Sequence, residues 1–448
     1  MRRVASAPSP RRFSLAQLIL IIPWVALVIA AWSPLRDNSF LWHIRAGSIQ
    51  ANGIRVLTED PFSFTMHGEQ WLTQSWLVEL FYDWAEMATG MGFVPLMVLF
   101  LSSLTMVGIG LITYRASRSV SATAIVLVLS TFLLISFLVP RPVIFSFTLF
   151  VLVILAWERP AARWTLPFLF WVWASVHGSF LIGLGYVVLS LIMRREWKWL
   201  RVPVVSGVLT LATAHGLGVV TMLVAFGEAR DTLLLLSEWR RPEWWSAAFL
   251  PLAGGVVIIV YGALRGRITP KHLWLLVPFL LLGMSATRAI PSAWLAIVPL
   301  IAIALGDLNV GGRKRFSMGA TAVFVSLVLV LPFLIRDDGA LDPERFPLTA
   351  VGALSEVNTF HDDVTGGYLI WVEGPGRMVY LDDRAELYQE RIGEFVAVRN
   401  GDMAWEPVFA RDEIGQVLLK KGEHLAVELE AAGWSVSYAD VSFVVLRP

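Results

Sequence analysis

Apolar stretches long enough to cross a lipid bilayer recur between residues 15 and 335 and then stop. A membrane-spanning helix needs about 20 predominantly apolar residues. Only 16% of the residues are charged and the mean hydropathy is +0.65, whereas a soluble domain carries about 25% charged residues. The chain is therefore predicted to be a polytopic α-helical membrane protein of about 11 spans, which excludes an ordinary cytosolic enzyme. The expected spans are 15–33, 91–114, 120–139, 142–157, 164–176, 178–193, 202–226, 247–264, 273–286, 289–306 and 317–335.

Three divisions between spans follow from charge and length. The apolar stretch 164–193 would be about 45 Å long as one helix, against a hydrocarbon core of about 30 Å. Arg163 precedes this stretch and Arg194 follows it, and basic loops favour the cytoplasmic side. Both ends therefore face one compartment, which predicts a hairpin near His177-Gly178. The same reasoning predicts turns at Pro140-Arg141-Pro142 and around Arg288.

The distribution of charge also predicts the orientation. With 11 spans, the inner segments hold 18 basic and three acidic residues. The N-terminus is then cytoplasmic, the first span stays uncleaved, and everything after residue 335 is extracytoplasmic. The expected protein is a multi-pass plasma-membrane protein with a transmembrane domain at 1–335, a first outer loop at about 34–90, and an outer domain at 336–448.

The segment 336–448 differs in composition from the rest, with 21 acidic and ten basic residues. It is long enough to bury its own core and is predicted to be a small α/β domain. Its expected strands are Tyr368–Val372, Met378–Leu381, Gln416–Leu419 and Ser442–Leu446, and its expected helices are Pro347–Phe360 and His424–Ala432.

Composition excludes several classes of function. The chain has no cysteine, which excludes disulfides, thiolate metal sites and cysteine nucleophiles. Its 36 basic residues are balanced by 35 acidic residues, so no basic excess indicates a nucleic-acid partner.

The polar residues of interest all fall on the predicted outer side, where an ionisable group close to the membrane is a functional candidate. Asp37, just past the first span, could serve as a general base. Arginines suit the phosphate of an anionic lipid, and histidines could position substrate or carry a proton. The residues assigned to substrate and donor-phosphate binding are His43, Arg141, His177, Glu238, Arg240 and Arg288; secondary candidates are Asp60, Glu79, Asp382 and Arg384.

Asp37, Arg141, His177, Glu238 and Arg288 are expected to converge in one outer-leaflet cavity beneath the C-terminal domain. For each of them a solvated loop charge, an ion pair or a tight turn is the alternative interpretation.

These features resemble the C-type (GT-C) polytopic glycosyltransferases, a superfamily that includes oligosaccharyltransferase catalytic subunits and protein O-mannosyltransferases. The likeness extends over essentially the whole chain and is strongest to bacterial membrane proteins assigned to that superfamily by architecture. It is carried by Asp37…Trp42-His43-Ile44…Gly47, Asp60-Pro61-Phe62-Ser63, Trp76…Glu79, Trp173…His177-Gly178…Gly183, Glu238-Trp239, and Gly366-Gly367-Tyr368-Leu369…Asp382-Asp383-Arg384-Ala385-Glu386-Leu387-Tyr388.

The resemblance implies transfer of a sugar from a polyprenyl-phosphate-linked donor to a glycan, lipid or protein acceptor on the outer face of the membrane. It assigns the catalytic base to Asp37. Relatives often carry two acids spaced as Asp-x-Asp at this point, whereas this chain reads Asp37-Asn38-Ser39, so a divalent cation (Mg²⁺ or Mn²⁺) stays open as a cofactor.

Two other classes of function stay open beside the transferase. A transporter or flippase for a lipid-linked glycan would show internal repeats and charges near mid-membrane, but this chain gathers its polar residues at one face. A non-catalytic membrane scaffold would use its outer domain for binding, and 11 spans are excessive for an anchor.

Overall fold

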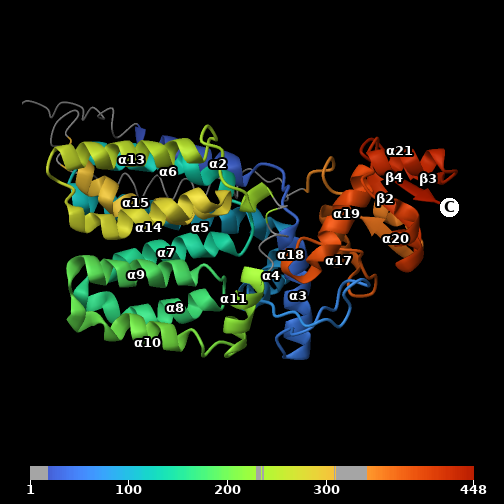
Figure 1. Ribbon diagram of the computed structural model, residues 1–448, viewed down its shortest axis with the longest axis horizontal. Coiled ribbons are helices and arrows are strands. Elements are labelled where there is room, and N and C mark those ends of the chain that lie inside the picture. The colour runs from blue at the N-terminus through green and yellow to red at the C-terminus, as the bar shows by residue number, and fades with distance from the viewer. Residues whose placement is uncertain (1–18, 229–233, 235–236, 307, 309–340) are drawn as a thin grey trace, which may run out of the picture.

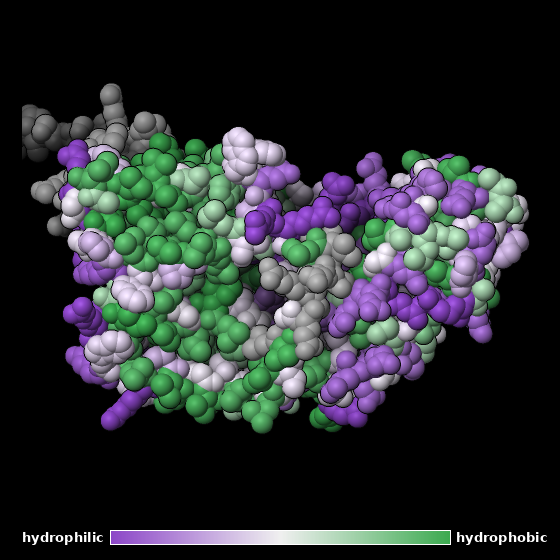
Figure 2. Space-filling model, in the orientation of Figure 1, coloured by the Kyte–Doolittle hydropathy of each residue, from purple (hydrophilic) through white to green (hydrophobic). Residues whose placement is uncertain are grey.

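The computed structural model describes residues 19–228, 234, 237–306, 308 and 341–448. Figure 1 shows a bundle of helices lying side by side, with a smaller domain of helices and strands at one end of the bundle. In Figure 2, apolar side chains cover much of the visible bundle surface and hydrophilic ones gather on the smaller domain. This contrast is typical of a protein whose bundle faces lipid and whose smaller domain faces water.

The bundle is built from helices that are apolar around most of their circumference, which favours burial in a core or in lipid. The helix α15 lies within it, with nearly all of its residues buried. The bundle helices are α2 (Ile22–Ala31), α5 (Phe93–Ser117), α6 (Val120–Leu134), α7 (Val143–Trp157), α8 (Leu166–Ala174), α9 (Phe180–Arg194), α10 (Arg201–Leu209), α13 (Phe249–Leu264), α14 (Leu273–Ser285) and α15 (Ile290–Leu305).

Fewer helices than predicted meet the requirements for a span. Among the described residues, three are long and apolar enough to cross a membrane, Trp76–Ser117, Val120–Phe137 and Thr287–Leu305, and five further apolar helices have 10–17 residues. The predicted span 202–226 is interrupted, because α10 ends at Leu209 and the next helix begins at Gly218. The predicted span 317–335 and the start of 15–33 lie outside the described residues.

The predicted turns are confirmed. The chain turns between α8 and α9 at residues 175–179 and between α14 and α15 around Arg288. It also turns between α6 and α7, where Pro140 and Pro142 flank Arg141. A proline cannot donate the backbone hydrogen bond of a helix interior, so the two prolines delimit this turn.

Two helices of the predicted first outer loop, α3 (Ser39–Gly53) and α4 (Trp76–Thr89), lie between the bundle and the smaller domain, near α11 (Gly218–Glu228). In Figure 1, α3 runs across the end of the bundle. A Cβ on Gly47 would lie 2.0 Å from the carbonyl oxygen of Glu79, so only glycine permits the close approach of α3 and α4.

The smaller domain, residues 341–448, is a four-stranded sheet with helices around it. The strand order is β1-β2-β4-β3; β1 pairs with β2 in parallel, and the other two pairs are antiparallel. Its elements are β1 (Asn358–His361), α17 (Asp363–Glu373), α18 (Ala385–Tyr388), α19 (Glu390–Asn400), α20 (Trp405–Arg411), β2 (Ile414–Lys420), α21 (His424–Ala431), β3 (Ser435–Ala439) and β4 (Phe443–Arg447).

The predicted strands Gln416–Leu419 and Ser442–Leu446 and the predicted helix His424–Ala432 are confirmed as β2, β4 and α21. The predicted helix Pro347–Phe360 is wrong, since that segment forms a short 3-10 turn and then most of β1.

Two predicted strands of the smaller domain are also wrong. The run Tyr368–Val372 lies in α17, which starts where the Asp362 carboxylate caps the helix by accepting a hydrogen bond from the Thr365 amide. The run Met378–Leu381 lies outside the four-stranded sheet, and its Val379 instead forms an isolated bridge with Ser63 of the predicted first outer loop.

Candidate functional site

Four of the residues predicted to converge form one chain of ion pairs at the end of the bundle. Asp37 Oδ2 accepts a hydrogen bond from Arg141 Nε at 2.6 Å. Glu238 then bridges the two arginines, with 3.4 Å to Arg141 Nη1 and 3.3 Å to Arg288 Nη1. Residues from four separate parts of the sequence therefore share one charged site, and the predicted convergence of these four residues is confirmed.

The site lies where the bundle joins the smaller domain. The side chains of Arg141, Arg288 and Glu238 are 31%, 34% and 40% exposed, so solutes can reach them. Asp37 is more enclosed, at 9%.

Local structure fixes the orientation of the Asp37–Arg141 pair. Asp37 Oδ1 accepts a hydrogen bond from the backbone amide of Ser39 at 3.0 Å, which holds the carboxylate at the start of α3. On the other side, the Tyr82 hydroxyl donates to the carbonyl of Pro140 at 2.9 Å and anchors the turn that carries Arg141. Both charges are therefore placed by backbone contacts.

Asp383, which belongs to the motif Asp382-Asp383-Arg384 but was not among the predicted site residues, is a fifth charged member of this site. Its carboxylate accepts hydrogen bonds from the Ser39 hydroxyl and, at 2.6 Å, from Trp42 Nε1, and lies 3.9 Å from Arg141 Nη2. Burial raises the pKa of Asp383 above the ordinary value, and the Arg141 charge opposes that rise. The available signal was the run Asp382-Asp383-Arg384 directly before α18.

His177 lies in the turn between α8 and α9 rather than in the ion-pair chain. Its Nδ1 accepts a hydrogen bond from the Ser179 amide at 3.1 Å and lies 2.9 Å from the Ser179 hydroxyl. The next residue, Gly178, is tightly enclosed, because a Cβ there would lie 2.6 Å from the Gln74 side-chain nitrogen.

His43 and Glu79 belong to a buried polar cluster behind the site. His43 Nδ1 lies 2.8 Å from Glu79 Oε1, and Glu79 also accepts hydrogen bonds from Gln50 and Thr73. The His43 ring stacks on the Trp42 ring, with 3.5 Å between the ring centroids, and Trp42 Nε1 donates a hydrogen bond to the Asp383 carboxylate. Through Trp42, this buried cluster therefore helps to position Asp383 in the site.

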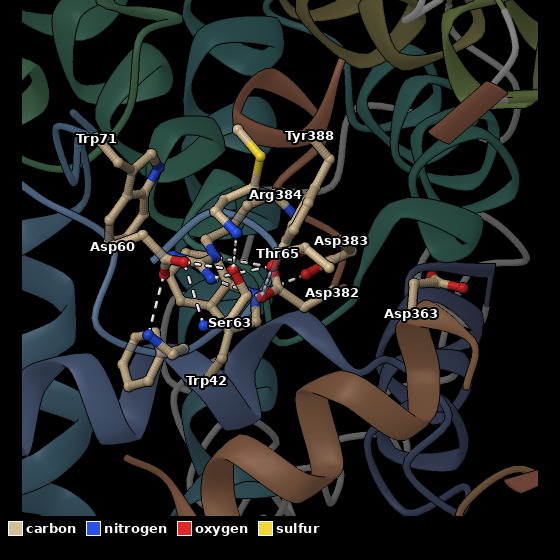
Figure 3. Close-up of polar contacts among 12 residues, drawn as sticks. Trp42, Asp60, Ser63, Thr65, Trp71, Asp363, Asp382, Asp383, Arg384 and Tyr388 are labelled. Atoms are coloured by element: carbon tan, nitrogen blue, oxygen red, sulfur yellow. Dashed lines mark hydrogen bonds and ion pairs between the residues drawn. The ribbon is translucent and has the colours of Figure 1, made fainter. Parts of the chain in front are cut away.

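Asp60, Asp382 and Arg384, three of the secondary candidates, form a second buried cluster. Arg384 donates to both oxygens of Asp382 at 2.8 and 2.6 Å, and its Nη1 lies 2.8 Å from Asp60 Oδ1, with all three side chains 0% exposed. The Tyr388 hydroxyl completes it by donating to Asp382 at 2.8 Å. In Figure 3 these four residues face one another, whereas Asp363 points away.

This second cluster joins the segment 34–90, the predicted first outer loop, to the smaller domain. The Arg384 guanidinium lies over the Trp71 ring, 4.6 Å from its centroid, which adds a cation–π contact. Complete burial and mutual ion pairing give these charges a structural task, distinct from that of the partly exposed ion-pair chain.

Arg240 is exposed, and its Nε donates to the carbonyl of Leu234 at 3.2 Å. Its own carbonyl accepts a hydrogen bond from the Thr287 amide at 2.9 Å. The backbone of Arg240 thus ties the segment carrying Glu238 to the segment carrying Arg288.

Within the described ranges, no group of three or more histidine, aspartate or glutamate side chains is arranged to hold a metal ion. Between Asp37 and Asp383, the place that a cation would take is filled by the guanidinium of Arg141. These residues do not fit the divalent cation that the sequence left open.

No protein-family model and no curated protein matches this chain.

Proposed function

We propose that the protein is an integral-membrane glycosyltransferase of GT-C type, which moves a sugar from a polyprenyl-phosphate-linked donor to an acceptor on the outer face of the membrane. The observation that carries the proposal is the ion-pair chain Asp37–Arg141–Glu238–Arg288 at the end of an apolar helix bundle. Such a site offers guanidinium groups for a phosphate and a carboxylate for a hydroxyl, beside a surface suited to a lipid tail.

The arginines bind the donor phosphate in this proposal. Guanidinium groups hydrogen-bond phosphate oxygens in a forked geometry. Negative charge grows on the phosphate as the sugar leaves, so preorganised guanidiniums stabilise the transition state more than the ground state. The positions of Arg141 and Arg288 on either side of Glu238 bring both donors to one anion.

Asp37 is the proposed base. It removes the proton from the acceptor hydroxyl while the bond between sugar and phosphate breaks. In the structure, one of its oxygens is held by Arg141. An ionised carboxylate has about four lone-pair sites, so Asp37 can accept the proton of the acceptor hydroxyl while it stays paired with Arg141.

The partners that follow are the lipid-linked sugar donor, a glycan, lipid or protein acceptor, and the membrane lipids, with no nucleic acid. The charged residues lie at one end of the bundle, which favours a reaction at one membrane face over transport of a lipid-linked glycan through the bundle. A transport assay with the lipid-linked glycan is the matching test of the transporter alternative.

The proposed orientation places the smaller domain outside the cell. A reporter that is active only in the periplasm, fused after Pro448, is expected to give signal, and a reporter active only in the cytoplasm is expected to give none. The reason is the excess of basic residues in the segments assigned to the inside. A cytoplasmic signal would reverse the orientation and remove the proposed site from the outer face.

Arg288→Ala tests the proposed function directly. A hydrogen bond to a charged group contributes about 1.5–3 kcal/mol, so the variant should bind the donor lipid about 10- to 100-fold more weakly. Arg141→Ala should act in the same direction. Donor affinity and sugar transfer are measured separately in nanodiscs, with Arg36→Ala as the control, because Arg36 is 69% exposed and pairs with Asp342 outside the ion-pair chain. Unchanged donor affinity in both Arg288→Ala and Arg141→Ala would contradict the proposal that these arginines bind the donor phosphate.

A further inference from the structure

Glu238 is the acidic residue of the ion-pair chain that is easiest to displace. Its side chain is 40% exposed, whereas those of Asp37 and Asp383 are 9% and 14% exposed. Its two contacts, at 3.3 and 3.4 Å, are longer than the 2.6 Å contact between Asp37 and Arg141. Partly exposed pairs of this length contribute little stability each.

The surroundings of Glu238 stay in place when its carboxylate moves. Glu238 lies on the single 3-10 turn η5 (Ser237–Trp239), and the Arg288 guanidinium lies 4.2 Å from the Trp239 ring centroid. The cation–π contact keeps Arg288 oriented without Glu238. Arg141 keeps its contacts with Asp37 and Asp383 in the same way.

The Glu238 carboxylate places one oxygen against each of two guanidinium groups. A bound phosphodiester would do the same, because its two non-bridging oxygens also share one negative charge. Resting on the proposed function, we propose that Glu238 occupies the position of the donor's phosphate, and that the donor therefore carries a single phosphate group rather than a diphosphate. The carboxylate turns outward when the donor binds.

Charge supports the single phosphate. Two arginines face three carboxylates in the ion-pair chain as extended by Asp383. A sugar phosphodiester carries one negative charge and replaces one carboxylate, so the balance between the arginines and their anions is preserved. A diphosphate linkage brings a second negative charge close to Asp37 and Asp383, which like-charge repulsion disfavours.

Glu238→Gln is the central test. Removal of the competing carboxylate raises the fraction of molecules ready to bind, and the apparent dissociation constant falls in proportion. The probes are the methyl esters of a polyprenyl monophosphate and of the matching polyprenyl diphosphate, in phosphatidylcholine nanodiscs. The native protein is expected to bind the monophosphate ester about tenfold more tightly than the diphosphate ester, a difference of ~1.4 kcal/mol.

In Glu238→Gln, monophosphate affinity is expected to rise about tenfold, again ~1.4 kcal/mol, and preference over the diphosphate to shrink. Glu238→Ala should act alike, which guards against an effect of the glutamine itself. Glu243→Gln, which removes an exposed acid from the same loop, should change neither affinity. Two other sources of a phosphate group are tested as competitors: phosphatidylglycerol, included in the nanodiscs, and inorganic phosphate, added to the buffer. Neither should displace the monophosphate ester at equal concentration.

Other outcomes separate the two proposals. Weaker or unchanged monophosphate binding in both Glu238 variants, or a native preference for the diphosphate ester, would overturn the inference while leaving the transferase intact. Tighter binding in the variants without any sugar transfer by the native protein would overturn the proposed function and support the anion site. Effective competition by phosphatidylglycerol would overturn selectivity for a polyprenyl donor. If neither ester binds to the native protein or to the Glu238 variants, both the proposed function and the inference about Glu238 are overturned.

Discussion

Asp37→Asn is expected to lower the rate of sugar transfer by about 10²–10⁴-fold, the usual contribution of a positioned general base. Asparagine keeps the shape and the hydrogen-bonding capacity of the side chain but cannot take the acceptor's proton. Donor-lipid affinity should be retained, because Arg141 keeps Glu238 and Asp383 as partners in the variant. Single-turnover transfer and lipid binding, measured on one preparation, separate these effects.

Asp383→Asn is the matched control for this prediction, since it removes a second carboxylate from the same arginine. Its transfer rate should fall far less, because both oxygens of Asp383 already accept hydrogen bonds from Ser39 and Trp42. Transfer at the native rate by Asp37→Asn would place the base elsewhere, and loss by Asp383→Asn alone would assign it to Asp383. The melting temperature of each variant shows whether it is folded.

Arg384→Met should produce the largest loss of stability, about 3–5 kcal/mol, the range measured when one partner of a buried ion pair is removed. Methionine fills much of the volume but leaves the carboxylates of Asp60 and Asp382 buried without their cation. The free energy of unfolding in detergent, followed by denaturant titration, measures the loss.

Arg411→Met is the control for Arg384→Met. Arg411 also pairs with two acids, Glu394 and Asp412, but is 46% exposed. Exposed pairs contribute about 0.2–1 kcal/mol, so this variant should remain close to the native stability. Equal losses in the two arginine variants would contradict the structural task of the buried cluster.

Charge and proline patterns were enough to place the turns of the bundle. Arg141 between two prolines and Arg288 within a long apolar stretch each mark a real helix end, because a basic side chain avoids lipid and proline ends a helix. Helix lengths were harder to predict. Continuous hydropathy across 202–226 concealed the break between α10 and α11, which includes Gly216 with a φ of +54°.

The smaller domain shows why local patterns failed there. The apolar run Tyr368–Val372 has the composition of a buried strand, yet the Asp362 cap starts a helix. Gly366 lets that helix approach a neighbouring segment, since a Cβ would lie 1.9 Å from the carbonyl oxygen of Leu381. The cap is a local signal that the apolar run concealed, whereas the contact between Gly366 and Leu381 joins two segments and leaves no periodic signal.

The same limit applied to the candidate site. Asp37 and Asp60 are both acids of the predicted first outer loop, but Asp37 faces the partly exposed Arg141 and Asp60 is fully buried against Arg384. Only the pairing partner distinguishes them, and the partner comes from elsewhere in the chain. Asp383 was missed for this reason, since its role depends on Ser39 and Trp42.

The junction between the segment 34–90 and the smaller domain has a consequence for biosynthesis. Ser39 and Asp383 are separated by 344 residues, and Trp71 and Glu386 by 315. The ribosome thus completes the whole bundle before it makes the partners that these side chains need. Until then the loop's donors are hydrated and the arginine turn lacks one of its anions. A truncated chain cannot assemble the full charged site, so completion of synthesis acts as a checkpoint for its formation.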